Sequence, residues 1–180
     1  MTRNVLPFGK NDLPRRGFPL SKLSGYHTRQ NMLNRHFQEF LTLLEDKEVK
    51  FMVIGGYAVA VHGFPRYTGD LDVFIAISRQ NANNVLDAFK DFGFGGLGLT
   101  AHDFLEEEMV IEIGREPMKI QVLTGIDGVT FNECYNNSVI FDIEGQKVRF
   151  IGFEELMKNK QASPRAKDKI DLEELRKIRR

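Results

Sequence analysis

Several features that mark large classes of proteins are missing from this sequence. Its 180 residues include one cysteine, Cys134, which excludes an internal disulfide framework and fits a reducing compartment. No apolar run approaches the ~20 residues that a membrane-spanning helix needs, and no apolar stretch follows the basic residues near the N-terminus, as a secretory signal requires. The four histidines lack zinc-ligand spacing. We therefore expect a cytoplasmic protein without a membrane partner.

An excess of charge of one sign is also missing. Lys and Arg together number 25, and so do Asp and Glu, so the field of the whole chain does not select for nucleic acid. The hydrophobic fraction of 42% is ordinary for a soluble globular protein, and the length corresponds to about one domain. The function must therefore be sought in local motifs.

The N-terminal segment differs in composition from the rest of the chain. Residues 1–28 hold three of the six prolines, and their charged residues are mostly basic. Proline removes an N–H donor and blocks helix formation, so we predict an extended basic arm there. The arm is either a poorly ordered tail or a contact for a partner or a second copy. Residues 29–180 form one domain, on which the late helices over 153–178 pack.

Apolar periodicity and turn residues predict interleaved helices and strands after the arm. Ser78 is a plausible N-cap for a helix that ends at residue 92. The other predicted helices cover 30–45, 57–62, 131–136, 153–160 and a segment from Pro164 to 178, and the predicted strands cover 49–54, 71–77, 108–113, 119–123, 139–143 and 147–151. Two connections, at Pro117 and at Glu144-Gly145, indicate hairpins. We therefore expect an α+β (mixed α/β) fold with a mixed sheet flanked by helices.

The segment 93–98 formally matches the dinucleotide-binding pattern G-x-G-x-x-G. That pattern requires a strand before it and a helix after it, whereas a predicted helix precedes it here. We interpret residues 93–98 as a flexible loop between a helix and a strand.

The segment 53–75 carries the strongest chemical pattern. Gly55-Gly56 lies between an apolar strand and a short helix, where glycine lets the backbone approach a ligand and the helix N-terminus offers N–H groups to an anion. Asp70 and Asp72 alternate with apolar residues, so both carboxylates point the same way, with Cα atoms roughly 7 Å apart. Such oxygen ligands suit magnesium, and two metal ions can activate a hydroxyl and stabilise a leaving pyrophosphate.

This combination resembles the nucleotidyltransferase superfamily with the DNA polymerase β-type fold, and within it the small bacterial branch of AbiEii-type toxins and minimal nucleotidyltransferases. The resemblance covers about residues 35–178. It is carried by Ile54-Gly55-Gly56-Tyr57-Ala58-Val59-Ala60, His62-Gly63, Arg66, Thr68, Asp70-Leu71-Asp72, the run from Lys119 to Thr124, Asp127-Gly128, Asn159-Lys160, Arg165, Lys167-Asp168 and Asp171-Leu172.

The resemblance implies a nucleotidyltransferase fold, an NTP substrate, and Mg²⁺ or Mn²⁺ as cofactor. Gly55 and Gly56 would hold the triphosphate. Asp70 and Asp72 would bind the metal ion and act in catalysis.

Further roles follow from the same resemblance. Arg66 or Thr68 would steady the phosphates or the loop, and Lys160 would neutralise phosphate charge. Arg165 and Asp168 would equally fit an internal ion pair that positions the last helix.

One position departs from the family pattern. The family usually places a third carboxylate on a later strand, and the matching residue here is Gln121. Its amide can ligate through oxygen but cannot accept a proton as a carboxylate does. Glu112, on the neighbouring predicted strand, could substitute if the two strands register suitably. Asp127 is another candidate, although its turn explains it adequately.

Two hypotheses of different classes follow. The first is an enzyme that moves a nucleoside monophosphate from an NTP to a hydroxyl of a small molecule, a protein side chain or an RNA end. The second is a catalytically impaired relative that binds nucleotide or acts in a toxin–antitoxin or regulatory complex, with the N-terminal arm as the contact for an antitoxin or a second copy. A glycosyltransferase that uses Asp70 and Asp72 for a nucleotide sugar is a third, weaker reading.

Overall fold

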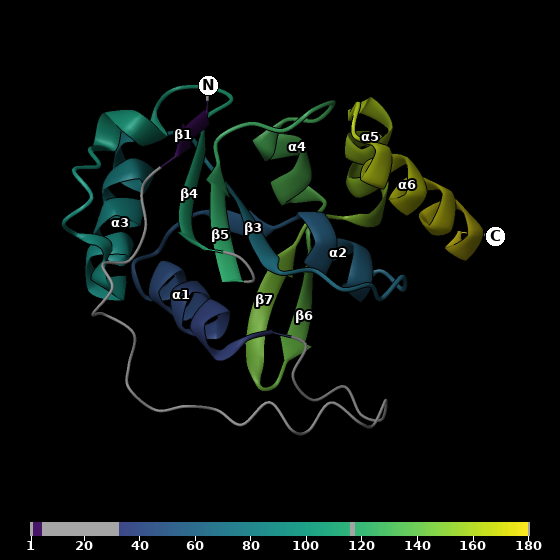
Figure 1. The fold of residues 1–180 in the computed structure, drawn as a ribbon, viewed down its shortest axis with the longest axis horizontal. Helices are drawn as coiled ribbons and strands as arrows, with labels where there is room; N and C mark the ends of the chain where they lie inside the picture. The colour runs from purple at the N-terminus through teal and green to yellow at the C-terminus, as the bar shows by residue number, and fades with distance from the viewer. Residues whose placement is uncertain (1, 5–32, 116–117, 180) are drawn as a thin grey trace.

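The computed structural model describes residues 2–4, 33–115 and 118–179. The segment expected to form the N-terminal arm lies outside the described residues except for Thr2–Asn4, which form the short strand β1. β1 pairs in parallel with β4 (Val110–Arg115) at one edge of the sheet. In the rest of the described chain, helices are interleaved with single strands and with the hairpin pairs β4–β5 and β6–β7 (Figure 1).

The described residues form one seven-stranded sheet in the order β1-β4-β5-β3-β2-β7-β6. The remaining strands are β2 (Phe51–Val53), β3 (Asp70–Ile75), β5 (Met118–Leu123), β6 (Val139–Ile143) and β7 (Gln146–Phe150). β3 runs parallel to β5, whereas β4 and β2 run antiparallel to their neighbours β5 and β3. The sheet is therefore mixed, and the predicted fold class is confirmed.

Six α-helices flank this sheet among the described residues. They are α1 (Arg35–Asp46), α2 (Gly55–Val61), α3 (Arg79–Phe89), α4 (Phe131–Asn136), α5 (Phe153–Ala162) and α6 (Ala166–Ile178). Figure 1 shows α5 and α6 together at one end of the molecule and α3 at the other. No helix of the described part is long and apolar enough to cross a membrane.

Local capping sets where several helices begin. Ser78 accepts a hydrogen bond from the Asn81 N–H at the start of α3, as its predicted N-cap role requires. The helix predicted over 30–45 begins at Arg35 within the described residues, because the Asn34 side chain accepts a hydrogen bond from the His36 N–H as its N-cap, and residues 30–32 lie outside the described residues. Residues 90–94, partly inside the predicted loop, form a π-helical turn in which Gly93 has a φ of 98°.

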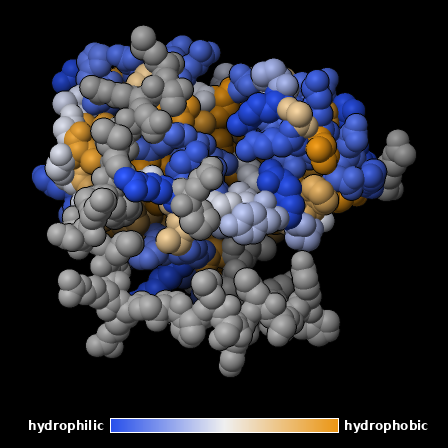
Figure 2. Space-filling view, viewed as in Figure 1, coloured by the Kyte–Doolittle hydropathy of each residue, from blue (hydrophilic) through white to orange (hydrophobic). Residues whose placement is uncertain are grey.

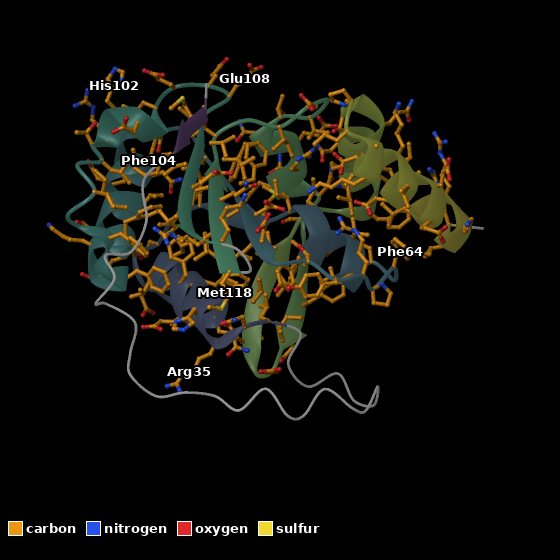
Figure 3. The ribbon with its side chains drawn as sticks, in the orientation of Figure 1. Arg35, Phe64, His102, Phe104, Glu108 and Met118 are labelled. Atoms are coloured by element: carbon orange, nitrogen blue, oxygen red, sulfur yellow. The ribbon has the colours of Figure 1, made fainter. Side chains whose placement is uncertain are left out.

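Aromatic side chains fill the core. Phe40 packs edge-on against Phe89 with ring centroids 5.6 Å apart, and Phe89 packs in the same way against Phe104. Figure 3 shows Phe104 beside α3, the helix that carries Phe89. Each of these rings is almost completely buried, which contributes roughly 1.5–3 kcal/mol per side chain relative to exposure. This core fixes the sheet whose polar face carries the candidate site.

Candidate functional site

Five polar side chains share one face of three adjacent strands. Asp72 on β3 lies opposite Gln121 on β5, which lies opposite Glu112 on β4. One step along the same face, Asp70 lies opposite Lys119. Side chains two residues apart on a strand point to the same side, so these residues converge. We call Asp70, Asp72, Glu112, Lys119 and Gln121 the acidic face.

Direct contacts connect the β4 and β5 members of the acidic face to β3. The Gln121 amide nitrogen donates to Glu112 Oε1 at 2.5 Å, and Lys119 Nζ lies 3.2 Å from the same oxygen. Lys119 Nζ also lies 3.7 Å from Asp70 Oδ2. The register that a substituting Glu112 requires is therefore present. Because the Gln121 amide nitrogen is committed to Glu112, its carbonyl oxygen is the atom left to serve as a ligand.

The glycine pair opens α2 and touches the acidic face. Gly55 has a φ of +63°, and a Cβ atom there would lie 1.8 Å from Asp72 Oδ2. A Cβ atom at Gly56 would lie 2.6 Å from Thr68 Oγ1. Thr68 in turn donates to the Asp70 backbone carbonyl at 3.3 Å. Both glycines are therefore required by the close approach of the loop and strand that carry the two aspartates.

A cleft of about 400 Å³ opens beside the acidic face. Its walls come from the sheet, from the start of α2, from the turn after β5 and from the α5–α6 region, through residues that include Asp72, Gln121, Gly55, Asp127, Lys160 and Arg165. The Asn159 side chain donates to the Asp127 carbonyl at 3.0 Å and ties α5 to the turn. Glu108 also lines the cleft; it precedes the start of β4, and Figure 3 shows it away from Met118 at the start of β5.

Asp72 has an unusual electrostatic environment. Burial, followed by repulsion from Asp70, raises the pKa of Asp72 to about 6. The positive charges of Lys167, Lys160 and Arg165 oppose this rise in pKa without cancelling it. The carboxylate therefore lies where additional positive charge would be favourable.

A second cluster joins α5 and α6 to the loop before β3. Lys160 Nζ donates to Asp168 Oδ1 and lies 3.3 Å from Asp171 Oδ2. The guanidinium of Arg66 binds both Asp171 carboxylate oxygens, at 2.7 and 2.9 Å, and Arg165 Nε donates to Asp168 Oδ2 at 2.7 Å. We call Lys160, Asp168, Asp171, Arg66 and Arg165 the helical ion network.

The centre of the helical ion network is buried, whereas Arg165 and part of Arg66 reach the surface. The Lys160 side chain is 2% exposed, and the Asp168 and Asp171 carboxylates are buried as well. Ser163 Oγ donates to Asp168 Oδ2 at 2.6 Å. Bonding to Lys160 and Ser163 outweighs burial and lowers the pKa of Asp168. Above this network the surface of α5 and α6 is mostly hydrophilic, with small separate hydrophobic spots (Figure 2).

The structure separates the expected site residues into two groups. Asp70, Asp72, Gln121 and Glu112 share the acidic face, and Gly55 and Gly56 adjoin it through Asp72 and Thr68. Arg66 and Lys160 have their charged groups turned to Asp168 and Asp171.

Two cations near the site were not assigned a role from the sequence. These are Lys119, within the acidic face, and Lys167, an exposed residue close enough to act on Asp72. The sequence contains a signal for Lys119: Lys119 and Gln121 have the same two-residue spacing on β5 as Asp70 and Asp72 on β3, which places both on one side of the strand.

The donor atoms of the acidic face suit a hard divalent cation. Among the described residues, no group of three or more His, Cys, Asp or Glu side chains is placed to hold a metal ion. Asp70 and Asp72 supply two carboxylates on one side of β3, and Gln121 adds an amide oxygen. Mg²⁺ is commonly bound by one or two carboxylates, with water and substrate phosphates completing its shell, so this smaller set fits it.

Comparison with protein families identifies the chain's relatives. Residues 33–180 match the family described as "Nucleotidyl transferase of unknown function (DUF2204)", and the chain belongs to this family. The nucleotidyltransferase superfamily expected from the sequence is thereby confirmed, whereas the AbiEii-type branch gains no support from this match. No curated protein matches the chain.

Two solved structures have a similar fold. The lincosamide antibiotic adenylyltransferase LnuA, solved with lincomycin bound, is 15% identical, with a TM-score of 0.52 over 81% of this chain and 98% of that one. A putative nucleotidyltransferase from Thermotoga maritima is also 15% identical, with a TM-score of 0.52 over 79% of this chain and 89% of that one. At this level of identity the likeness shows the fold alone, and that fold is the nucleotidyltransferase fold.

Proposed function

We propose that this member of the nucleotidyl transferase family moves a nucleoside monophosphate from an NTP to a hydroxyl acceptor, with Mg²⁺ or Mn²⁺ bound at Asp70 and Asp72. The observation that carries the proposal is the convergence of Asp70 and Asp72 beside a cleft that also reaches Gly55. The acceptor is a hydroxyl of a small molecule, a protein side chain or an RNA end.

The proposed reaction balances without an additional reactant. The acceptor oxygen forms a bond to the α-phosphorus, and the bond from that phosphorus to the bridging oxygen breaks, so pyrophosphate leaves with the electron pair. The bound divalent ion supplies charge neutralisation for the triphosphate. The hydroxyl proton passes to a carboxylate of the acidic face, and we assign this role to Glu112 because Asp70 and Asp72 hold the ion.

The cleft has cationic side chains suited to a polyphosphate. Arg165 lines the cleft, and Lys167 lies close enough to Asp72 to lower its pKa. In this proposal the backbone at Gly55 and Gly56 approaches the triphosphate, and Thr68 holds the loop against α2. Arg66 and Lys160 contribute by fixing α5 and α6 against that loop through Asp168 and Asp171.

A second candidate function follows from Gln121. The third carboxylate position carries a neutral amide whose nitrogen is bonded to Glu112. A site altered in this way would still bind nucleotide while transferring slowly, and the protein would then serve as a nucleotide-binding or toxin–antitoxin and regulatory partner.

Calorimetry of nucleotide binding tests the proposed function. Wild-type protein should bind at least one of the four NTPs in a Mg²⁺-dependent manner, and ATP is the first to test because one fold neighbour is an adenylyltransferase. Changing Asp70→Asn together with Asp72→Asn should remove this binding and leave the fold intact. The control changes Asp46→Asn and Asp87→Asn, which removes two exposed carboxylates outside the cleft. Equal binding by the two double variants would contradict the proposed metal site.

A further inference from the structure

Lys119 is the member of the acidic face that the proposed reaction does not use. It lies on β5, between the strands that carry Asp70 and Glu112. Its ammonium nitrogen is 3.2 Å from Glu112 Oε1 and 3.7 Å from Asp70 Oδ2. Lys119 pairs with Asp70 on β3 and with Gly114 on β4, and Glu112 lies two residues before Gly114 on the same side of β4.

The position of this ammonium is the one a second cation would need. A metal ion shared by Asp70 and a carboxylate further along the sheet would lie over β5, between the two flanking strands. Lys119 brings a positive charge to that place from the chain itself, with its side chain 21% exposed. The ammonium, 3.2 Å from Glu112 Oε1 and 3.7 Å from Asp70 Oδ2, occupies the space between these two oxygens, where an ion shared by them would lie.

Lys119 and Gln121 shift the net charge of the acidic face in the same direction. Compared with a site that has a neutral residue at 119 and a carboxylate at 121, Lys119 adds one positive charge and Gln121 removes one negative charge. The two residues together make the face two units more positive, and two units is the charge of one divalent cation. Together the two residues would therefore balance the loss of one divalent cation.

We infer that the ammonium of Lys119 replaces one of two divalent cations, so that the site works with one metal ion and one lysine. This inference rests on the proposed function and adds to it the number of ions and a second cationic group. The metal ion belongs to the Asp70 and Asp72 side of the face, and the ammonium occupies the Asp70 and Glu112 side.

In this arrangement the Lys119 ammonium and the metal ion have different roles. The ammonium of Lys119 donates hydrogen bonds and charge to the acceptor oxygen, and it remains protonated throughout the transfer. It acidifies a hydroxyl less than a metal ion does, so Glu112 takes the proton directly. Gln121 is a positioning residue, because its amide nitrogen holds the Glu112 carboxylate next to Lys119.

Counting bound Mn²⁺ by electron paramagnetic resonance tests the inference. The measurement uses the full chain, Mn²⁺ and a saturating α,β-methylene analogue of the nucleotide that binds in calorimetry. Wild-type protein should bind one Mn²⁺ per chain. Lys119→Met should bind two, and adding Gln121→Asp to that variant should tighten the second ion at least tenfold. Lys147→Met, an exposed lysine on β7, is the matched control and should bind one ion.

Each outcome separates the two proposals. Two ions in the wild type, or one ion in a folded Lys119→Met protein, would overturn the inference and leave nucleotidyl transfer intact. Lys119→Gln replaces Lys119→Met in the measurement if the latter does not fold. A wild-type protein that binds neither nucleotide nor Mn²⁺ would overturn the proposed function and the inference together.

Discussion

The acidic face and the helical ion network both contribute to the walls of one cleft and differ in charge balance. The acidic face contains three carboxylates and one cation, whereas the helical ion network contains three cations and two carboxylates. Each charge at the buried centre of the network, on Lys160, Asp168 and Asp171, has a partner within the network. The acidic face opens to a cleft through Asp72 and Gln121, and its negative charges outnumber its one positive charge. We infer that the network positions the cleft wall and that the acidic face receives a ligand.

The two clusters affect the stability of the fold in different ways. Buried ions are stable only when each charge keeps its partner, so the network ties α5, α6 and the loop before β3 into one arrangement. In the acidic face, burial and then repulsion from Asp70 raise the pKa of Asp72. Repulsion of this kind is relieved when a cation binds, and it is common at functional sites.

The largest expected effect comes from breaking the helical ion network. Lys160→Met leaves Asp168 and Asp171 buried without their central cation, so the free energy of unfolding should fall by about 3–5 kcal/mol. Urea denaturation followed by circular dichroism measures this change. The same substitution in the acidic face, Lys119→Met, is the matched control.

Lys119→Met should cost about 1 kcal/mol or less, because Lys119 and its two carboxylates are partly exposed to solvent. Equal losses of unfolding free energy in Lys160→Met and Lys119→Met would contradict the argument that burial makes the first ion cluster more important for stability.

A smaller change, this time an increase in the free energy of unfolding, should follow when the Asp72 carboxylate of the acidic face is made neutral. The pKa of Asp72 is about 6 in the folded chain and about 3.9 in an unfolded one. The folded state therefore holds the proton more tightly, and the stability that this group contributes is full below pH 4 and is lost as the pH rises through 6.

Asparagine at this position cannot titrate. In the presence of EDTA, Asp72→Asn should be more stable than wild type by about 2 kcal/mol at pH 7.5, and the gap should close near pH 4. Urea denaturation at several pH values measures the gap, with Asp87→Asn on the exposed side of α3 as the control. A difference in unfolding free energy that stays constant with pH would show that the pKa of Asp72 is not raised in the folded state.

The sequence was sufficient for those parts of the site that depend on local spacing. The alternation of Asp70 and Asp72 with Leu71 and Val73 already places both carboxylates on one side of β3, and the structure buries the two apolar residues. The N-cap role of Ser78 and the turn at Glu144-Gly145 are local in the same sense, and the structure confirms them.

The contacts between distant elements could not be derived in this way. Lys119 meets Asp70 and Glu112 only because β5 lies between β3 and β4, and a sequence does not show that order directly. Lys160 looks like an exposed lysine of a basic helix until α6 folds back and brings Asp168 and Asp171 against it. Arg66 reaches Asp171 across 105 residues of chain.

The most direct test of the account is a crystal structure with Mn²⁺ and an α,β-methylene nucleotide, measured at a wavelength where Mn²⁺ scatters anomalously. The account predicts an anomalous peak within bonding distance of the Asp70 and Asp72 carboxylates, with the nucleotide phosphates in the cleft that Gly55 and Arg165 line. A nucleotide bound elsewhere, or a Mn²⁺ peak away from both aspartates, would contradict it.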